Sequence, residues 1–245
     1  MKKALKYQIS DLKSVFIIYF IIMAALFAAG SLSLSVFRMN PSASSFSLGL
    51  SGTIVCFVTG LAMFHEHFGM LIQNGFSRKI YFKSSLCTIC ILSIAFSVGE
   101  GILSKIIQVI SSFSKNIVVK NSIQMIFPSL YEKLSEGMGF FLNIILTSAL
   151  TACLFMLGYL IAAIFYRLPN NFKTPFAILL PVCAFVILPV AVSLYPSAAY
   201  GFLDILLSVT GISSQNLLHT FLFFVIAFLL LSFISHLVVK RAEVK

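Results

Sequence analysis

Long apolar stretches, each about as long as a membrane-crossing helix, recur along this chain of 245 residues. They cover residues 14–36, 46–64, 84–110, 138–165, 175–194 and 217–239, with very few charged side chains among them. An α-helix needs about 20 residues to cross ~30 Å of hydrocarbon, and each stretch reaches about that length. The sequence therefore predicts an all-α, polytopic membrane protein in which six transmembrane helices form a single domain over residues 1–245.

The composition supports lipid as the main solvent. Only 10% of the residues are charged, 60% are hydrophobic, and the mean hydropathy is +1.05. A soluble domain has about 25% charged residues. The net charge of +10 does not indicate nucleic acid, because the cationic residues lie in short clusters between apolar stretches and not on a polar domain. We expect them to face lipid headgroups, and we predict no nucleic-acid partner.

The positions of Lys and Arg predict the orientation. Of the 17 such residues, four precede the first stretch, three follow the second, two follow the fourth and three follow the sixth. Cytoplasmic loops of membrane proteins carry an excess of these residues. Because all four segments lie on one side of a six-helix protein, both termini are predicted to be cytoplasmic.

Three segments outside these stretches have apolar character of their own. Residues 1–13 interleave lysines with apolar residues, which is typical of an amphipathic helix on the membrane surface. Residues 113–137 are polar but retain Ile, Val and Phe, so we expect them to pack on helix ends. Residues 195–215 are too apolar for a solvated loop and too short to span, which favours a re-entrant helical hairpin between helices 5 and 6 over a loop packed flat on its neighbours.

The segment 65–82, HEHFGMLIQNGFSRKIYF, joins the second and third stretches on the predicted cytoplasmic face. Its mixture of apolar and polar residues predicts a short surface helix, broken near Gly75, with an apolar side open to a partner. Ser77 is expected to cap the third helix. The alternative is an ordinary positively charged loop.

This segment resembles the cytoplasmic coupling region of ABC-2 type ABC-transporter permeases from Gram-positive bacteria. The residues concerned are Glu66, Gly69, Leu71, Gly75, Phe76, Ser77, Arg78, Lys79 and Tyr81. All of these except Tyr81, together with Phe68, are predicted to couple the chain to a partner subunit. In coarse form the resemblance covers the whole chain, with a basic surface helix, six spans and a hairpin before the last. The chain departs from the family in its HEH sequence at 65–67 and in a longer loop between the third and fourth spans.

The resemblance implies a permease subunit in a bacterial cell membrane that exports a hydrophobic or amphipathic substrate such as a peptide. It implies two partners: a separate ATPase subunit, which binds ATP and Mg²⁺ and docks on the coupling segment, and a second permease subunit, identical or homologous. This chain would then hold no cofactor and be no enzyme. The sequence contains no GxxxxGK[ST] phosphate loop, which agrees with this division of labour.

A few polar residues lie within the apolar stretches. Asn143, Thr147 and Thr151 recur at helical spacing, so we predict that they line a pathway or a dimer interface. Glu100 is a functional candidate because ionisable residues inside membranes are costly. It would otherwise lie at the water interface or pair with Lys105. A secondary carrier remains an alternative, although carriers usually show more buried carboxylates.

Enzymatic and metal sites receive less support. The sequence Gly49-Leu50-Ser51-Gly52 and His219 are similar to elements of rhomboid intramembrane proteases, but here the serine opens the second span. A protease is therefore a minor alternative. His65 and His67 point about 200° apart on a helix, so we predict no metal site there.

Overall fold

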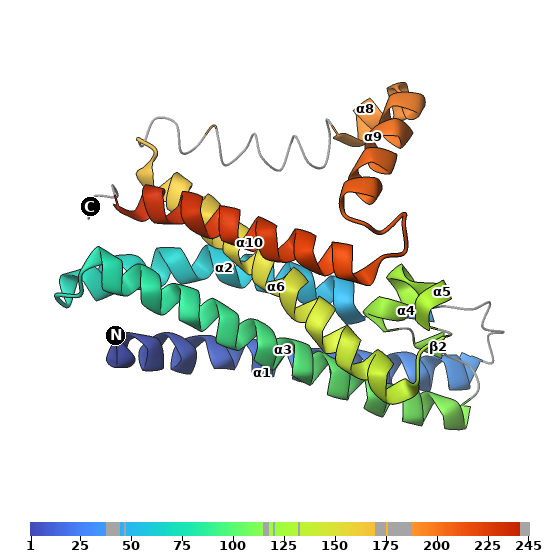
Figure 1. Ribbon diagram of the computed structural model, residues 1–245. Coiled ribbons are helices and arrows are strands. Elements are labelled where there is room, and N and C mark those ends of the chain that lie inside the picture. Colours follow the sequence, from blue (N-terminus) through green and yellow to red (C-terminus); the bar gives the residue numbers. More distant parts are fainter. Residues whose placement is uncertain are drawn as a thin grey trace.

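The computed structural model describes residues 1–37, 45–46, 48–114, 118–119, 121–131, 133–169, 175 and 188–240. Five long helices dominate it: α1 (Lys2–Phe37), α2 (Leu48–Gln73), α3 (Arg78–Ser114), α6 (Glu136–Arg167) and α10 (Leu217–Lys240). They form one bundle in which α1 and α3 run in one direction and α2, α6 and α10 run in the other (Figure 1). Shorter elements are β1 (Ser45–Phe46), β2 (Val118–Val119), α4 (Ser122–Ile126), α5 (Pro128–Tyr131), α8 (Leu188–Leu194) and α9 (Pro196–Val209).

These five long helices are apolar and long enough to cross a membrane. The prediction of a polytopic helical membrane protein is thereby confirmed. The spans predicted at 14–36, 46–64, 84–110, 138–165 and 217–239 correspond to α1, α2, α3, α6 and α10. The span predicted at 175–194 lies mostly outside the described residues, and only its last part is seen, as α8.

The two ends of the bundle differ in charge. The start of α1, the turn between α2 and α3, and the last residues of α6 and α10 lie together at one end (Figure 1). We call this the basic end, because Lys2, Arg78, Arg167 and Lys240 lie there. The opposite end carries the short elements β1, β2, α4, α5, α8 and α9 (Figure 1).

Helix α1 corrects the prediction of a separate surface helix over residues 1–13. The basic segment and the first span form one continuous helix, and the sequence has neither Gly nor Pro between residues 2 and 29 to interrupt it. Its buried residues repeat every three or four positions and face the bundle: Ala4, Gln8, Leu12, Phe16, Tyr19 and Met23. Residues 1–13 therefore pack on α3 as part of the bundle, and their lysines stay exposed on the outer side.

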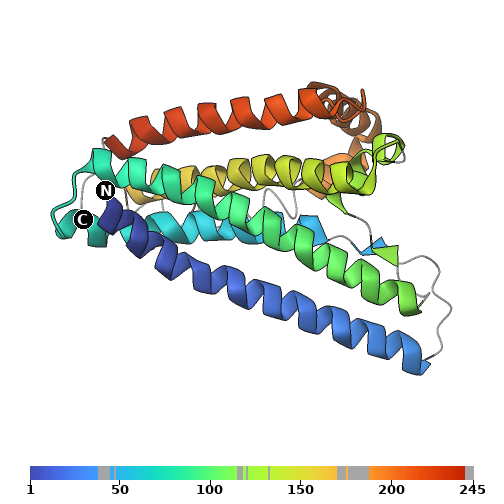
Figure 2. The same cartoon turned by 60° about the horizontal axis from the view of Figure 1, so that its bottom comes forward.

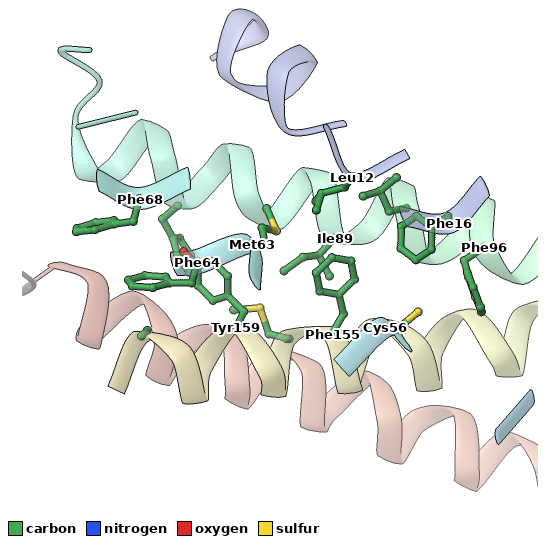
Figure 3. Close-up of a cluster of buried hydrophobic side chains, with 14 of the residues drawn as sticks. Leu12, Phe16, Cys56, Met63, Phe64, Phe68, Ile89, Phe96, Phe155 and Tyr159 are labelled. Atoms are coloured by element: carbon green, nitrogen blue, oxygen red, sulfur yellow. The ribbon is translucent and has the colours of Figure 1, made fainter. Parts of the chain in front are cut away.

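The closest helix contact is between α2 and α6. A Cβ atom added at Gly60 would lie 2.2 Å from the carbonyl oxygen of Phe155, and one at Gly158 would lie 2.1 Å from that of Phe57. The two glycines thus let the backbones touch directly, as small residues do at helix contacts in membranes. Around this contact, side chains of α1, α2, α3 and α6 form the main core, including Phe16, Met63, Ile89 and Phe155 (Figure 3).

Helices α1 and α10 lie on opposite sides of the bundle, with α2, α3 and α6 between them (Figure 2). At the end opposite the basic end, α4 and α5 pack on α6 through the buried side chains of Ile123, Phe127 and Leu146. The prediction that residues 113–137 pack on helix ends is confirmed for this described part.

Helix α9 differs from the other helices in its surroundings. Its large apolar side chains are exposed on every side, with Tyr200 at 68% and Phe202 at 62% of full exposure. Among the described elements it packs mainly on α8. The predicted segment 195–215 therefore contains one helix of 14 residues followed by a turn, and its re-entrant insertion stays a prediction.

Candidate functional site

The predicted coupling segment 65–82 forms the end of α2, a tight turn and the start of α3. It does not form a separate surface helix, because α2 continues through Gln73 and α3 begins at Arg78. Gly75 ends α2 with a φ of +81°, a left-handed conformation that glycine adopts at little cost. The N–H of Phe76 donates to the carbonyl of Leu71 at 3.1 Å and closes the turn.

Ser77 has the capping role that the sequence predicts. The N–H of Ile80 donates to Ser77 Oγ at 3.4 Å, in the first turn of α3. Ser77, Gly75 and Lys79 are exposed, whereas Phe76 and Arg78 are half-buried. The turn between α2 and α3 therefore presents a short polar surface at the basic end.

Two predicted coupling residues face the interior. Phe68 is fully buried and Leu71 is 3% exposed, so neither offers an apolar side to a partner. The correction has a simple geometric reason. With Phe64, they continue the inward-facing stripe of α2 at a spacing of four and three residues. Glu66 is exposed on another side of α2, near α1, and Gly69 is half-buried.

Aromatic rings hold the turn on the bundle. The ring of Phe68 lies 5.0 Å from Phe64, 5.3 Å from Tyr81 and 5.2 Å from Tyr166, measured between centroids. Phe64 also contacts Tyr159 at 5.2 Å. Such pairs contribute about 0.5–1.5 kcal/mol each beyond their buried area. We call these five residues the aromatic anchor; it joins α2, α3 and α6 directly beneath the turn.

Helix α10 is joined to the same region. The guanidinium of Arg78 donates through Nη1 to the carbonyl of Lys240 at 3.1 Å. The rings of Phe82 and His236 lie 4.9 Å apart. A displacement of the turn would therefore move residues that contact four of the long helices, α2, α3, α6 and α10.

The polar residues of α6 lie on one face, as predicted, but this face is inside the chain. Asn143, Thr147 and Thr151 are each at most 2% exposed. The threonine hydroxyls donate to carbonyls four residues earlier, at 2.6 Å and 2.8 Å. Asn143 Oδ1 accepts the N–H of Ile123 at 3.2 Å and so holds α4 in place. In this arrangement the three residues form no dimer surface; a role in a pathway stays a prediction.

Glu100 is also enclosed, at 2% exposure on α3. Ser122 Oγ donates to Glu100 Oε1 at 3.4 Å, while Oε2 has no hydrogen-bond partner among the described residues. Lys105 pairs with Glu136 at 3.6 Å, so pairing of Lys105 with Glu100 is not what the structure shows. A carboxyl group is thus kept inside the bundle near the end opposite the basic end.

Two polar contacts of α1 were missed by the sequence analysis. Gln8 is fully buried, and its amide donates to Ser85 Oγ at 3.1 Å. Its Oε1 accepts the hydroxyls of Ser84 at 2.8 Å and Thr88 at 3.0 Å. Gln8 lies four residues from both Ala4 and Leu12, so its place on the buried stripe could have been read from the spacing. The second contact joins Asp11 to His67, and no spacing rule connects residues so far apart.

The residues of the protease alternative lie on different elements. Ser51, at the start of α2, has its Oγ 2.9 Å from Tyr19 Oη and 4.0 Å from Met23 Sδ, both on α1. His219 is exposed at the start of α10, beside Gly211. These contacts give the protease alternative no geometric support.

No family model matches the chain, and neither a curated protein nor a solved structure matches it.

Proposed function

We propose that this chain is the membrane-spanning permease subunit of an ABC transporter, which exports a hydrophobic or amphipathic substrate such as a peptide. The observation that carries this proposal is the exposed polar turn at the basic end, fixed to the bundle by the aromatic anchor. A separate ATPase subunit, binding ATP and Mg²⁺, would dock on this turn.

The turn is suited to transmit a movement. Helices α2 and α3 leave it without a break and run the length of the bundle. The anchor ties both helices to α6, and Arg78 ties the turn to α10. A partner that pushes the turn would therefore reorient helices and not merely bend a loop. Such a change biases a two-state arrangement of the bundle, which is what nucleotide-driven transport requires.

The finer topology belongs to the same proposal. We place a sixth span at 175–194 and insert 195–215 as a re-entrant hairpin, with both termini in the cytoplasm of a bacterial cell. This orientation is supported by the lysines and arginines that gather at the basic end. A second permease subunit, identical or homologous, would complete the pathway.

Cross-linking at the turn tests the proposal. A Lys79→Cys variant, labelled with a thiol-reactive photo-cross-linker in native membranes, is expected to capture a protein that carries a GxxxxGK[ST] phosphate loop. Lys133→Cys is the matched control, because Lys133 is equally exposed but lies near α5, away from the basic end. The unsubstituted chain reports any labelling of its own cysteines. Capture of no ATPase by Lys79→Cys, together with transport that ignores ATP depletion, would refute the proposal.

A cation-coupled secondary carrier is the second candidate, and Glu100 is the observation that favours it. A buried carboxyl, one of whose oxygens has no partner in the described part of the chain, could take up a proton or a cation during transport. In proteoliposomes, a carrier would respond to an ion gradient in the absence of ATP, and Glu100→Gln would abolish that response. A permease of an ABC transporter would instead require its ATPase partner and ATP, and would not respond to an ion gradient alone.

A further inference from the structure

Three potential metal ligands meet where α1 and α2 approach each other near the basic end. Asp11 comes from α1, whereas Glu66 and His67 are neighbours on α2. His67 Nε2 lies 2.9 Å from Asp11 Oδ2. One donor atom from each of the three residues lies within 4.8 Å of the other two.

The burial of His67 is unusual for a residue paired in this way. Its side chain is 1% exposed, although it lies near the end of α2. The two residues before it, His65 and Glu66, are exposed, whereas the residue after it, Phe68, is buried. Nδ1 has no hydrogen-bond partner among the described residues. The ring of Tyr7 packs edge-on against the imidazole at 5.5 Å. The fold therefore holds an imidazole in a closed position with its Nε2 directed at the Asp11 carboxylate and the Glu66 carboxylate close by.

The charges of the cluster are not balanced by its own members. In the described part of the chain, neither Asp11 nor Glu66 forms an ion pair with a lysine or arginine. A proton on His67 would offset one of the two negative charges. A divalent cation would offset both and would leave the imidazole neutral, the form in which histidine binds metals.

The geometry fits shared coordination. Zinc binds nitrogen and oxygen ligands at about 2.0–2.2 Å, so two ligands of one ion lie roughly 3–3.5 Å apart. The separation of 2.9 Å between His67 Nε2 and Asp11 Oδ2 is close to this range. The three donor atoms lie within 4.8 Å of one another, so a small side-chain movement would bring all three onto one ion. A groove of about 530 Å³ between α1 and α2 is bordered by Asp11 and Glu66, which leaves room for water to complete the coordination.

We propose that Asp11, Glu66 and His67 form a site for a divalent transition metal such as Zn²⁺, which ties α1 to α2 near the basic end. One imidazole with two carboxylates is a ligand set that Zn²⁺, Fe²⁺ and Mn²⁺ accept. The two α2 ligands are adjacent in sequence, and the third comes from another helix. A search for a metal held by His65 and His67 of the same helix therefore does not find this site, because the third ligand is Asp11 of α1. The proposal does not depend on a transport function.

Isothermal titration of the full-length protein with Zn²⁺ tests the site. The protein carries a tag without histidines and is purified in detergent, and the metal is removed with a chelator before the titration. We expect one Zn²⁺ per chain, with affinity at least tenfold weaker in Asp11→Asn and His67→Gln, and also reduced in Glu66→Gln. His65→Gln is the matched control, because His65 is exposed and lies outside the cluster; its affinity should equal that of the unsubstituted chain.

Folding is monitored separately in each variant by gel filtration and by thermal unfolding. Asp11→Asn and Glu66→Gln alter exposed side chains with little change in shape, so they keep the test valid even if His67→Gln unfolds. Zn²⁺ should raise the melting temperature of the unsubstituted chain and of His65→Gln, but not that of Asp11→Asn. Absence of Zn²⁺ binding would overturn the proposal, as would binding that survives Asp11→Asn and Glu66→Gln unchanged.

Discussion

The direct contact between the backbones of α2 and α6 predicts that Gly158→Ala destabilises the bundle. Contacts of a Cβ atom essentially never fall below 3.0 Å, but an alanine Cβ here would lie 2.1 Å from the carbonyl oxygen of Phe57. The two helices must therefore separate locally by 0.9 Å or more, the difference between these two distances. Overpacking costs about 1–3 kcal/mol, and the upper part of that range applies because the obstacle is backbone and not a flexible side chain.

The control for this prediction lies on α2 itself. A Cβ at Gly69 meets no atom within 4 Å, so Gly69→Ala should leave the stability unchanged or raise it by up to about 1 kcal/mol through helix propensity. Gly158→Ala gains the same propensity, which leaves a net loss of about 2 kcal/mol in the free energy of unfolding.

The assay is unfolding of the purified protein by a denaturing detergent, followed by circular dichroism. A double variant with Gly60→Ala and Gly158→Ala should lose less than the sum of its parts, because one separation accommodates both methyl groups. Equal unfolding free energies for Gly158→Ala and Gly69→Ala would show that the backbones do not touch.

Three further predictions use the same unfolding assay. Gln8→Ala removes the acceptor of the buried Ser84 hydroxyl and should cost about 1–3 kcal/mol, whereas Lys6→Ala, on the exposed side of α1, should change little. Gly75→Ala should cost about 1–2 kcal/mol, because alanine is strained at a φ of +81°; an unchanged stability would argue against this turn. Phe127→Ala empties a fully buried site beneath α6 and should cost about 3–5 kcal/mol, far more than Met125→Ala at an exposed position of α4; similar losses would contradict this packing.

Five of the six predicted spans correspond to long apolar helices, because the length of a span is set by the bilayer, whereas the ends of these helices could not be predicted. Polar residues near a helix end normally suggest that the helix has stopped. In this bundle they continue the helix because they find partners inside, as Gln8 does on α3. His67 does the same at the end of α2, where it meets Asp11.

The segment 65–82, for which we predict a coupling role, illustrates a second reason why sequence patterns mislead. Its mixture of apolar and polar residues predicts a surface helix, although Phe64, Phe68 and Leu71 keep the spacing of the preceding span and belong to its inward face. The helical spacing of these three residues indicates that α2 continues, whereas the polar residues between them suggest a surface segment. The predicted break near Gly75 and the predicted cap at Ser77 are confirmed, because backbone conformation and capping depend on local chemistry.

The surroundings of the polar face of α6 and the pairing of Asp11 with His67 depend on how the helices pack, which the sequence does not give. Helical spacing places Asn143, Thr147 and Thr151 on one face of α6. The sequence does not tell whether that face meets a pathway, a second subunit or a neighbouring helix, whereas the structure shows it buried inside the chain. The pairing of Asp11 with His67 joins residues from different helices. Only the arrangement of α1 against α2 brings them together.

Helix α9 makes part of this protein responsive to the membrane itself. A helix of 14 residues is about 21 Å long, shorter than the ~30 Å hydrocarbon core. Among the described residues its apolar side chains are largely exposed and it packs mainly on α8, so we expect lipid to cover most of its surface if the helix inserts as proposed. Its depth would then follow the thickness of the surrounding bilayer, whereas the glycine contact would hold α2 against α6 in any bilayer. Thinner and thicker membranes should therefore shift α9 relative to a bundle that stays the same.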